Sequence, residues 1–195
     1  LLRAALEGSR EVLGERHPST LTSMGNLGSL LEDQGKLGEA EPLYRAALEG
    51  SREVLGERHP HTLASMNNLA LLLKDQGKLG EAEPLYRAAL EGRREVLGER
   101  HPDTLISMNN LAVLLKDQGK LGEAEPLFRA ALEGRREVLG ERHPDTLISM
   151  NNLASLLQVQ GKLGEAEPLC RAALEGNREV LGERHPDTLT SMNNL

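Results

Sequence analysis

The chain has 195 residues, a formal net charge of −7 and an aromatic content of 2%. The acidic balance disfavours a nucleic-acid partner, because phosphate binding needs clustered Lys and Arg, and few aromatic rings are available to stack on bases. No apolar run approaches the roughly 20 residues of a membrane-spanning helix, so no membrane insertion is expected. The single cysteine, Cys170, cannot form an internal disulfide and is typical of a reducing, cytoplasmic compartment.

The sequence repeats itself with a period of 42 residues. Segment Pro102–His143 differs from Pro60–His101 at four positions and from Pro144–His185 at five. One such unit cannot bury its own apolar face, so the repetition predicts stacked units. We expect a single array over residues 1–195, made of a partial helix at 1–14, complete repeats at 18–56, 60–98, 102–140 and 144–182, and a partial helix at 186–195.

Both ends of the chain fall inside helical patterns. Residues 1–14 match residues 43–56, and residues 186–195 begin a fifth repeat. We therefore expect the chain to be a segment of a longer array, with any targeting signal outside it. Incomplete repeats leave apolar positions uncovered, which predicts weak head-to-tail self-association through the terminal helices.

Each repeat contains two helical patterns. Apolar residues of the first recur at three- and four-residue spacing, which predicts one apolar stripe; in the third repeat these are Leu105, Met108, Leu111, Ala112 and Leu115. Pro102 suits the first helical position, and Gly119 suits a left-handed residue after the last one. No segment shows the alternation of a strand, so the predicted fold class is all-α.

A second helix is expected from about Glu123 to Leu139, after a Lys120-Leu121-Gly122 connection. A glycine interrupts its middle at a cost of about 1 kcal/mol relative to alanine. Its recurrence predicts a close backbone approach; the glycines concerned are Gly50, Gly92, Gly134 and Gly176.

The spacing within each repeat resembles the tetratricopeptide repeat. In the second repeat, the first-helix motif positions of that family fall on Met66, Leu69, Ala70 and Leu73. The Ala, aromatic and Ala of its second helix fall on Ala82, Tyr86 and Ala89. The 42-residue period, with NNLA, QGK and EAEPLY segments, is similar to the repeat of kinesin light chains. The resemblance implies an α-solenoid of stacked antiparallel helix hairpins and a non-catalytic, protein-binding scaffold.

One face of the first helix varies between repeats. On a helical wheel it lies away from the apolar stripe, and the resemblance implies that it lines a concave groove. Its six positions in the third repeat are Ile106, Asn109, Asn110, Val113, Lys116 and Asp117. Of nine differences among the second, third and fourth repeats, five fall on these positions, where an even spread would put about one. The candidate peptide-binding residues are Ala64, Asn67, Asn68, Leu71, Lys74, Ile106, Asn109, Asn110, Val113, Lys116, Ile148, Asn151, Asn152 and Ser155.

Two roles are open for the paired asparagines of this face. In kinesin light chains, the matching residues help to hold an extended peptide, and an amide both donates and accepts hydrogen bonds. Alternatively, Asn68, Asn110 and Asn152 form an internal ladder between helices. The wheel angle favours the groove for Asn67, Asn109 and Asn151.

Residues that suggest chemistry have simpler interpretations. The recurring His-Pro pairs lack the further ligands of a metal site and are expected to be linkers and helix starts. Cys170 aligns with Tyr44, Tyr86 and Phe128, so we expect a core thiol and no nucleophile. The pairs Arg93-Arg94 and Arg135-Arg136 could bind phosphate, but interleaved glutamates favour neutralisation on an outer surface.

These observations predict a protein-binding scaffold with no catalytic residues, no metal and no cofactor. Its expected partner is a protein or peptide segment. The alternative is a structural spacer or self-associating array without a specific ligand. A catalytic role is the most remote, because catalysis needs one asymmetric set of groups and near-identical repeats supply the same groups repeatedly.

Overall fold

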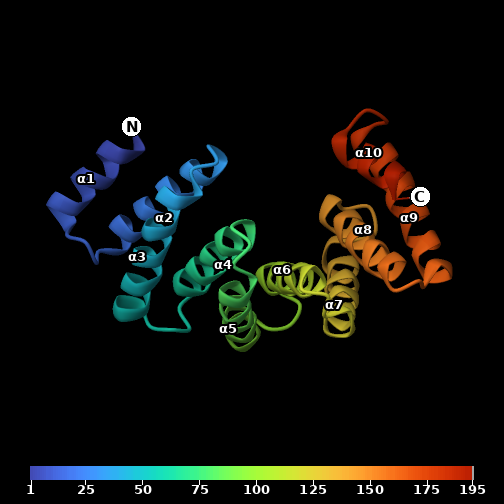
Figure 1. Cartoon of the computed structure of the whole chain (residues 1–195), viewed down its shortest axis with the longest axis horizontal. Helices are drawn as coiled ribbons and strands as arrows, with labels where there is room; N and C mark the ends of the chain where they lie inside the picture. The colour runs from blue at the N-terminus through green and yellow to red at the C-terminus, as the bar shows by residue number, and fades with distance from the viewer. Residues whose placement is uncertain (195) are drawn as a thin grey trace. The chain divides into compact units, whose positions relative to one another are not determined.

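The computed structural model describes residues 1–194, which form ten α-helices and no β-strand (Figure 1). In chain order the helices are α1 Leu2–Leu13, α2 Pro18–Asp33, α3 Leu37–Leu55, α4 Pro60–Asp75, α5 Leu79–Leu97, α6 Pro102–Asp117, α7 Leu121–Leu139, α8 Pro144–Val159, α9 Leu163–Leu181 and α10 Pro186–Asn193. Within each unit the helices pack as consecutive antiparallel hairpins, so the predicted all-α hairpin fold is confirmed. None of the described helices combines the length and apolar character needed to cross a membrane.

The helices form two compact units, Leu1–Val96 and Leu97–Leu195, of which residue 195 lies outside the described part. The N-terminal unit holds α1 and two hairpins, α2/α3 and α4/α5. The C-terminal unit holds the hairpins α6/α7 and α8/α9, followed by α10. The expected single array over residues 1–195 stays a prediction.

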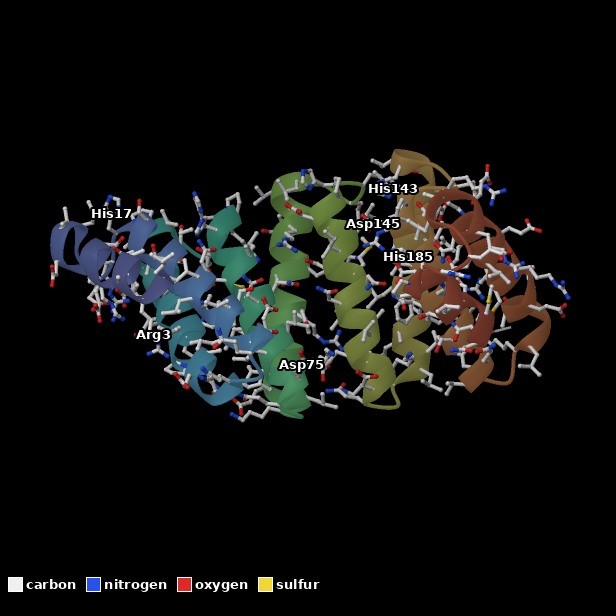
Figure 2. All side chains as sticks on the ribbon, turned by 90° about the horizontal axis from the view of Figure 1, so that it is seen from above. Arg3, His17, Asp75, His143, Asp145 and His185 are labelled. Carbon is white, nitrogen blue, oxygen red and sulfur yellow. The ribbon has the colours of Figure 1, made fainter. Side chains whose placement is uncertain are left out.

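A histidine starts the first helix of every hairpin. His143 and Asp145, both labelled in Figure 2, lie at the start of α8. Nδ1 of His143 accepts a hydrogen bond from the backbone N–H of Asp145 at 3.1 Å. The other four histidines that precede a proline make the same bond. Each is therefore an N-cap, which satisfies one of the free N–H groups of the first turn. The interpretation of His-Pro as a helix start is confirmed, with the imidazole as the capping group.

Glycines end the helices as predicted. Gly119 follows α6 with a φ of 76°, and Gly140 follows α7 with a φ of 89°. At the end of α6 the N–H of Lys120 donates to the Leu115 carbonyl at 2.8 Å. This bond, between residues five apart in the sequence, is the wider-spanning of the two hydrogen bonds of a Schellman motif.

The predicted start of the second helix was two residues late. Helix α7 begins at Leu121 because the carbonyl of Lys120 accepts from the N–H groups of both Glu123 and Ala124, each at 3.1 Å. Leu121 and Gly122 are therefore already helical.

The mid-helix glycine lies against a leucine of the first helix in each complete hairpin. A Cβ atom built on Gly134 of α7 would clash with Cδ2 of Leu105 on α6. Leu105 is fully buried, so it has little room to move away. The structure thus shows a close approach at this glycine, and the approaching group is a leucine side chain of the first helix, whereas the sequence had predicted a backbone approach.

Ion pairs join successive hairpins. Glu125 of α7 accepts from Lys162 Nζ at 2.7 Å and from Arg129 Nη2 at 2.8 Å. These bonds, with the one to Lys162 the strongest, lower the pKa of Glu125 to about 2. Glu41, Lys78 and Arg45 repeat the arrangement in the N-terminal unit.

Glu125→Gln is expected to cost stability at neutral pH and to cost progressively less in acid. The folded-state pKa lies below the ordinary value of 4.5, so the carboxylate stabilises the fold above that pH and ceases to do so as pH falls towards about 2. Urea unfolding at a series of pH values checks this, with Glu133→Gln on the exposed side of α7 as control. The prediction would be contradicted if the free energy of unfolding of Glu125→Gln differed from that of wild type by the same amount at pH 7 and at a pH of about 2.

Candidate functional site

The fourteen candidate residues lie on the first helices α4, α6 and α8, and none of them is buried. We call this set the first-helix face. Its most exposed apolar side chains are Ile106, 37% exposed, and Ile148, 40% exposed, which occupy the same repeat position on α6 and α8. Helices α6 and α8 pack side by side within the C-terminal unit, so nine of the candidates belong to one surface there. The other five lie on α4 in the N-terminal unit.

Hydrogen bonds cross the first-helix face between α6 and α8. Asn152 Nδ2 donates to Asn109 Oδ1 at 2.9 Å, and Lys116 Nζ donates to Ser155 Oγ at 3.3 Å. The ladder interpretation therefore holds for Asn152. It extends to Asn109, which the wheel angle had favoured as a ligand contact.

Asn151 is also engaged with a neighbouring helix. Its Nδ2 donates to Ser191 Oγ of α10 at 2.8 Å, and its Oδ1 is buried without a partner among the described residues. The Asn151 amide therefore has little accessible hydrogen-bonding capacity for a ligand. Asn109 keeps more capacity, because one accepted bond uses one of the four hydrogen-bonding positions of an amide.

The charge at the C-terminal end of the first helices changes along the chain. In the N-terminal unit, Glu32 at the end of α2 accepts from the Tyr44 hydroxyl at 3.0 Å, and burial raises the pKa of Glu32 against the effect of that bond. Gln158 stands at the same repeat position on α8, and the exposed Val159 follows it. This end of the first helix is thus acidic on α2, where Asp33 follows Glu32, and uncharged on α8. Comparing the first repeat with the others would have shown Glu32, where the second and third repeats have lysine.

The structure reveals a second surface that the sequence did not predict. Clefts recur between consecutive second helices, and leucines of the first helices form the bottom of each cleft. Arg–Glu pairs cross three of these junctions, at 2.6 Å for Arg3–Glu39, 2.8 Å for Arg45–Glu81 and 2.6 Å for Arg129–Glu165. The cleft between α3 and α5 has a volume of about 470 Å³ and is lined by Arg45, Leu48, Glu49, Arg52, Leu69, Leu73, Gly80, Glu81, Pro84 and Leu85. Equivalent clefts of about 360 and 670 Å³ lie between α1 and α3 and between α7 and α9.

These clefts are nearly identical in composition. The same residue types line each of them, so they carry no repeat-specific information, in contrast to the first-helix face. Their apolar floor is the hairpin core itself, because Leu69 and Leu73 are buried there. The clefts follow from how the second helices stack.

Arg135 is not an outer-surface residue, and its expected position was wrong. Its side chain is 6% exposed, and Nη1 donates to the Asp145 carbonyl at 2.9 Å and to Ser149 Oγ at 2.7 Å. It therefore joins α7 to the start of α8. The next residue, Arg136, does lie outside and pairs with Glu141 at 3.1 Å.

The position of Arg135 is buried in every complete repeat, and its side chain bonds to the next first helix in the third and fourth repeats. Asn177 fills it in the fourth repeat and donates to Ser191 Oγ at 2.9 Å, while Ser51 and Arg93 fill it in the first and second. The interleaved glutamates point elsewhere: Glu137 pairs with Arg100 at 2.9 Å rather than with Arg135. The helical wheel did not predict the burial of Arg135. Within its own hairpin this side of α7 is open, and it is the first helix of the next hairpin that covers it.

Cys170 is a buried core thiol. Its Sγ donates to the Asn194 carbonyl at 3.1 Å, and burial raises the pKa of the thiol. A nucleophilic cysteine needs a lowered pKa and a nearby base, so this environment is that of a structural residue. Across residues 1–194, no three His, Cys, Asp or Glu side chains converge to hold a metal ion.

Comparisons with known proteins agree with this architecture. Two family models described as tetratricopeptide repeat match the chain, one at residues 1–53, 26–95, 63–137 and 109–158 and the other at residues 146–187. No curated protein sequence matches significantly.

Solved structures of kinesin light chain-like repeat proteins are similar to the chain. One is a Podosopora anserina protein described as a kinesin light chain with nearly identical TPR-like repeats; it is 28% identical, with a TM-score of 0.81 over 92% of this chain and 85% of that one. A single-residue variant of it gives a TM-score of 0.82 at 28% identity, over 92% and 84% of the two chains. BtubC (BKLC) from P. vanneervenii, 24% identical, shares the fold with a TM-score of 0.84 over 100% of this chain and 78% of that one.

The family models together span far more than half of the sequence, and the solved structures share its stacked hairpins of about 42 residues. The chain therefore belongs to the tetratricopeptide repeat family, whose repeats generally mediate protein–protein interaction.

Proposed function

We propose that the chain is a non-catalytic scaffold that binds an extended or helical segment of a partner protein on its first-helix face. The observation that carries the proposal is the exposure of Ile106 and Ile148 beside partly exposed amides. An exposed apolar surface with hydrogen-bonding groups beside it suits a peptide whose side chains enter apolar sites. The concentration of repeat differences on this face supports the same assignment.

We propose that the partner binds mainly to the part of the first-helix face that lies in the C-terminal unit. Helix α6 carries Ile106, Asn109 and Val113, and the adjoining α8 carries Ile148 and Ser155. None of these five side chains carries a charge. A partner segment with apolar side chains would lose little on desolvating such a surface. Asn109 contributes hydrogen bonds, whereas Asn151 is mainly engaged with α10.

The proposal places the protein inside the cell with a protein partner and no nucleic-acid partner. A buried, unpaired thiol at Cys170 suits a reducing compartment, and the net charge of −7 opposes phosphate binding. The alternative is a structural spacer whose first-helix face binds nothing specific. The bonds from Asn152 to Asn109 and from Lys116 to Ser155 favour it, because they give those polar residues a structural use.

Ile106→Asp is expected to weaken binding of a selected peptide by more than about 2 kcal/mol, as loss of a central hot spot does. The peptide comes from a library selected on the purified chain, and affinity is measured by isothermal titration calorimetry. Val138→Asp is the matched control, because Val138 is a similarly exposed apolar residue on second helix α7. It should change affinity by less than about 0.5 kcal/mol.

The outcomes separate the two functions. If Val138→Asp lowered the affinity for the peptide more than Ile106→Asp did, the binding site would have to be assigned to the second helices. If no selected peptide bound the folded chain above background, the spacer role would replace the scaffold role.

A further inference from the structure

Two carboxylates at the C-terminal end of α2 have no cation beside them. Glu32 and Asp33 are the last two residues of the helix, and its last turn contains no basic residue. Within residues 1–194 no Lys or Arg forms an ion pair with either of them, whereas Glu41 on α3 pairs with both Arg45 and Lys78. A helix C-terminus has a partial negative charge, so carboxylates there are electrostatically unfavourable. The end of α2 therefore attracts a cation that the chain itself does not supply.

These two positions are accessible in every complete repeat. The position of Glu32 is half-buried and that of Asp33 is exposed on α2, α4, α6 and α8 alike. Lys74 and Lys116 fill the first position in the second and third repeats, and Gln158 fills it in the fourth. Among the complete repeats, only the first has a carboxylate there, so the acidic character is specific to this repeat and is not a property of the shared scaffold.

The Glu32 carboxylate is held in place beside further negative charge. Its Oε2 accepts from the Tyr44 hydroxyl at 3.0 Å. Burial raises the pKa of Glu32, and the charges of Asp75 and Asp33 raise it further, against the lowering effect of the Tyr44 bond. Asp75, labelled in Figure 2, ends α4, which packs beside α2. We call Glu32, Asp33 and Asp75 the acidic cluster; Lys74, which pairs with Asp75 at 2.9 Å, offsets only one of its three negative charges.

A buried hydroxyl group without a partner adjoins the acidic cluster. Tyr86 of α5 is 1% exposed, and its hydroxyl group makes no hydrogen bond within residues 1–194. Tyr44, at the same repeat position, donates to Glu32. The equivalent of Glu32 beside Tyr86 is Lys74, which cannot accept a hydrogen bond. Besides burial, the charges of Asp75 and Glu32 raise the pKa of Tyr86, so its hydroxyl group lies near both carboxylates. A buried polar group of this kind costs free energy until a ligand completes its bonding.

The separation of these acceptors decides which cation suits them. Among residues 1–194, no three His, Cys, Asp or Glu side chains converge closely enough to hold one metal ion. A guanidinium group has five N–H donors in a planar fork, so it reaches acceptors that stand apart. Carboxylates with a hydroxyl oxygen beside them are suitable acceptors for such a fork. The arrangement therefore favours an arginine side chain over a metal ion.

We propose that the acidic cluster binds an arginine side chain of a partner protein, with Glu32 and Asp75 as the carboxylates and the Tyr86 hydroxyl oxygen as a further acceptor. The cluster adjoins Lys74, which belongs to the first-helix face. The inference rests on the proposed function, in which a segment of a partner binds that face, and it names the side chain that the N-terminal unit recognises.

Titration of the nitrogen-15-labelled 195-residue chain with N-acetyl-arginine amide, followed by NMR, tests the proposal without a selected peptide. The probe should shift the backbone signals around Glu32 and Asp75, and the shifts should saturate with concentration. N-acetyl-citrulline amide, which has the shape of the arginine probe without its charge, should bind about tenfold more weakly or less, because a hydrogen bond to a charged group contributes about 1.5–3 kcal/mol.

Glu32→Gln should weaken binding of the arginine probe by about tenfold or more, although Tyr44 can still donate to the amide oxygen and so preserve the fold. Glu49→Gln is the matched control, because it removes one negative charge from an exposed residue of α3 in the same unit. It should change the affinity by less than about twofold. Tyr86→Phe copies Phe128 of the third repeat and removes an unpaired hydroxyl group. It should weaken binding of the probe without lowering the free energy of unfolding, which urea denaturation measures.

The results separate this proposal from the proposed function. Equal shifts with the arginine and citrulline probes would overturn the arginine site, as would binding of arginine that Glu32→Gln or Tyr86→Phe leaves unchanged. The proposed function would still stand in that case if Ile106→Asp weakened binding of a selected peptide. Conversely, binding of arginine that depends on Glu32, together with a library from which no peptide binds, would support the site and overturn the scaffold role.

Discussion

Gly134→Leu is expected to destabilise the C-terminal unit by about 3 kcal/mol or more. Even a Cβ atom at this position would meet Cδ2 of Leu105, and a whole leucine side chain has to displace the buried first helix. Overpacking of a filled interior typically costs 1–3 kcal/mol, and four added carbons lie at the upper end of that range. Chemical denaturation followed by circular dichroism measures the loss, and hydrogen exchange locates it in α6 and α7.

The chain supplies its own control for this substitution. Gly8→Leu is the same change at the same repeat position, where no neighbouring atom stands in the way. Leucine is a better helix former than glycine by up to about 1 kcal/mol, so this variant should be as stable as wild type or more so. Equal destabilisation by both variants would show that leucine is unfavourable in the helix itself and that the contact with Leu105 is unimportant.

Arg135→Glu should cost about 3 kcal/mol or more, because it puts an unpaired anion into a buried site. The guanidinium now donates to the Asp145 carbonyl and to Ser149 Oγ, both of which can accept. A carboxylate could not donate to that carbonyl, and it would add to the negative charge of Asp145. The loss would appear in thermal and urea unfolding of the C-terminal unit.

Two further substitutions decide whether burial is the cause. Arg135→Asn copies the fourth repeat, where Asn177 bonds to Ser191, and should cost less than about 1.5 kcal/mol, the worth of a typical hydrogen bond. Arg136→Glu breaks only an exposed pair with Glu141 and should cost less than about 1 kcal/mol. A greater loss for Arg136→Glu than for Arg135→Glu would exclude the buried position of Arg135.

Most of the fold could be predicted because it depends on local patterns that recur. The spacing of Leu105, Met108 and Leu115 locates a buried stripe, and proline and glycine locate the helix ends. The recurrence of Gly134 indicates a tight contact without naming its partner. The capping role of His143 was not predicted, because the proline after it is by itself a sufficient signal for a helix start, although an imidazole nitrogen can accept a backbone hydrogen bond.

The connections between hairpins were the unpredictable part. The buried position of Arg135 depends on a helix from the next repeat, and a helical wheel contains no information about that neighbour. The same limit applies to Asn109 and Asn151, since the wheel gives the direction of an amide and not which helix stands within its reach. One signal was available for Arg135: its replacement by Asn177 is a difference between repeats that falls outside the first-helix face.

The ion pairs between consecutive second helices also bear on mechanical stiffness. Arg45–Glu81 and Arg129–Glu165 each span a junction between hairpins, and all four side chains are substantially exposed. Such pairs add little to the free energy of unfolding, and salt screens them over a length of about 8 Å at physiological ionic strength. They do resist the separation of adjacent second helices, which opens the cleft between them while the apolar core stays closed. Each unit should therefore bend more easily at high salt without becoming much less folded, so ionic strength adjusts its elasticity.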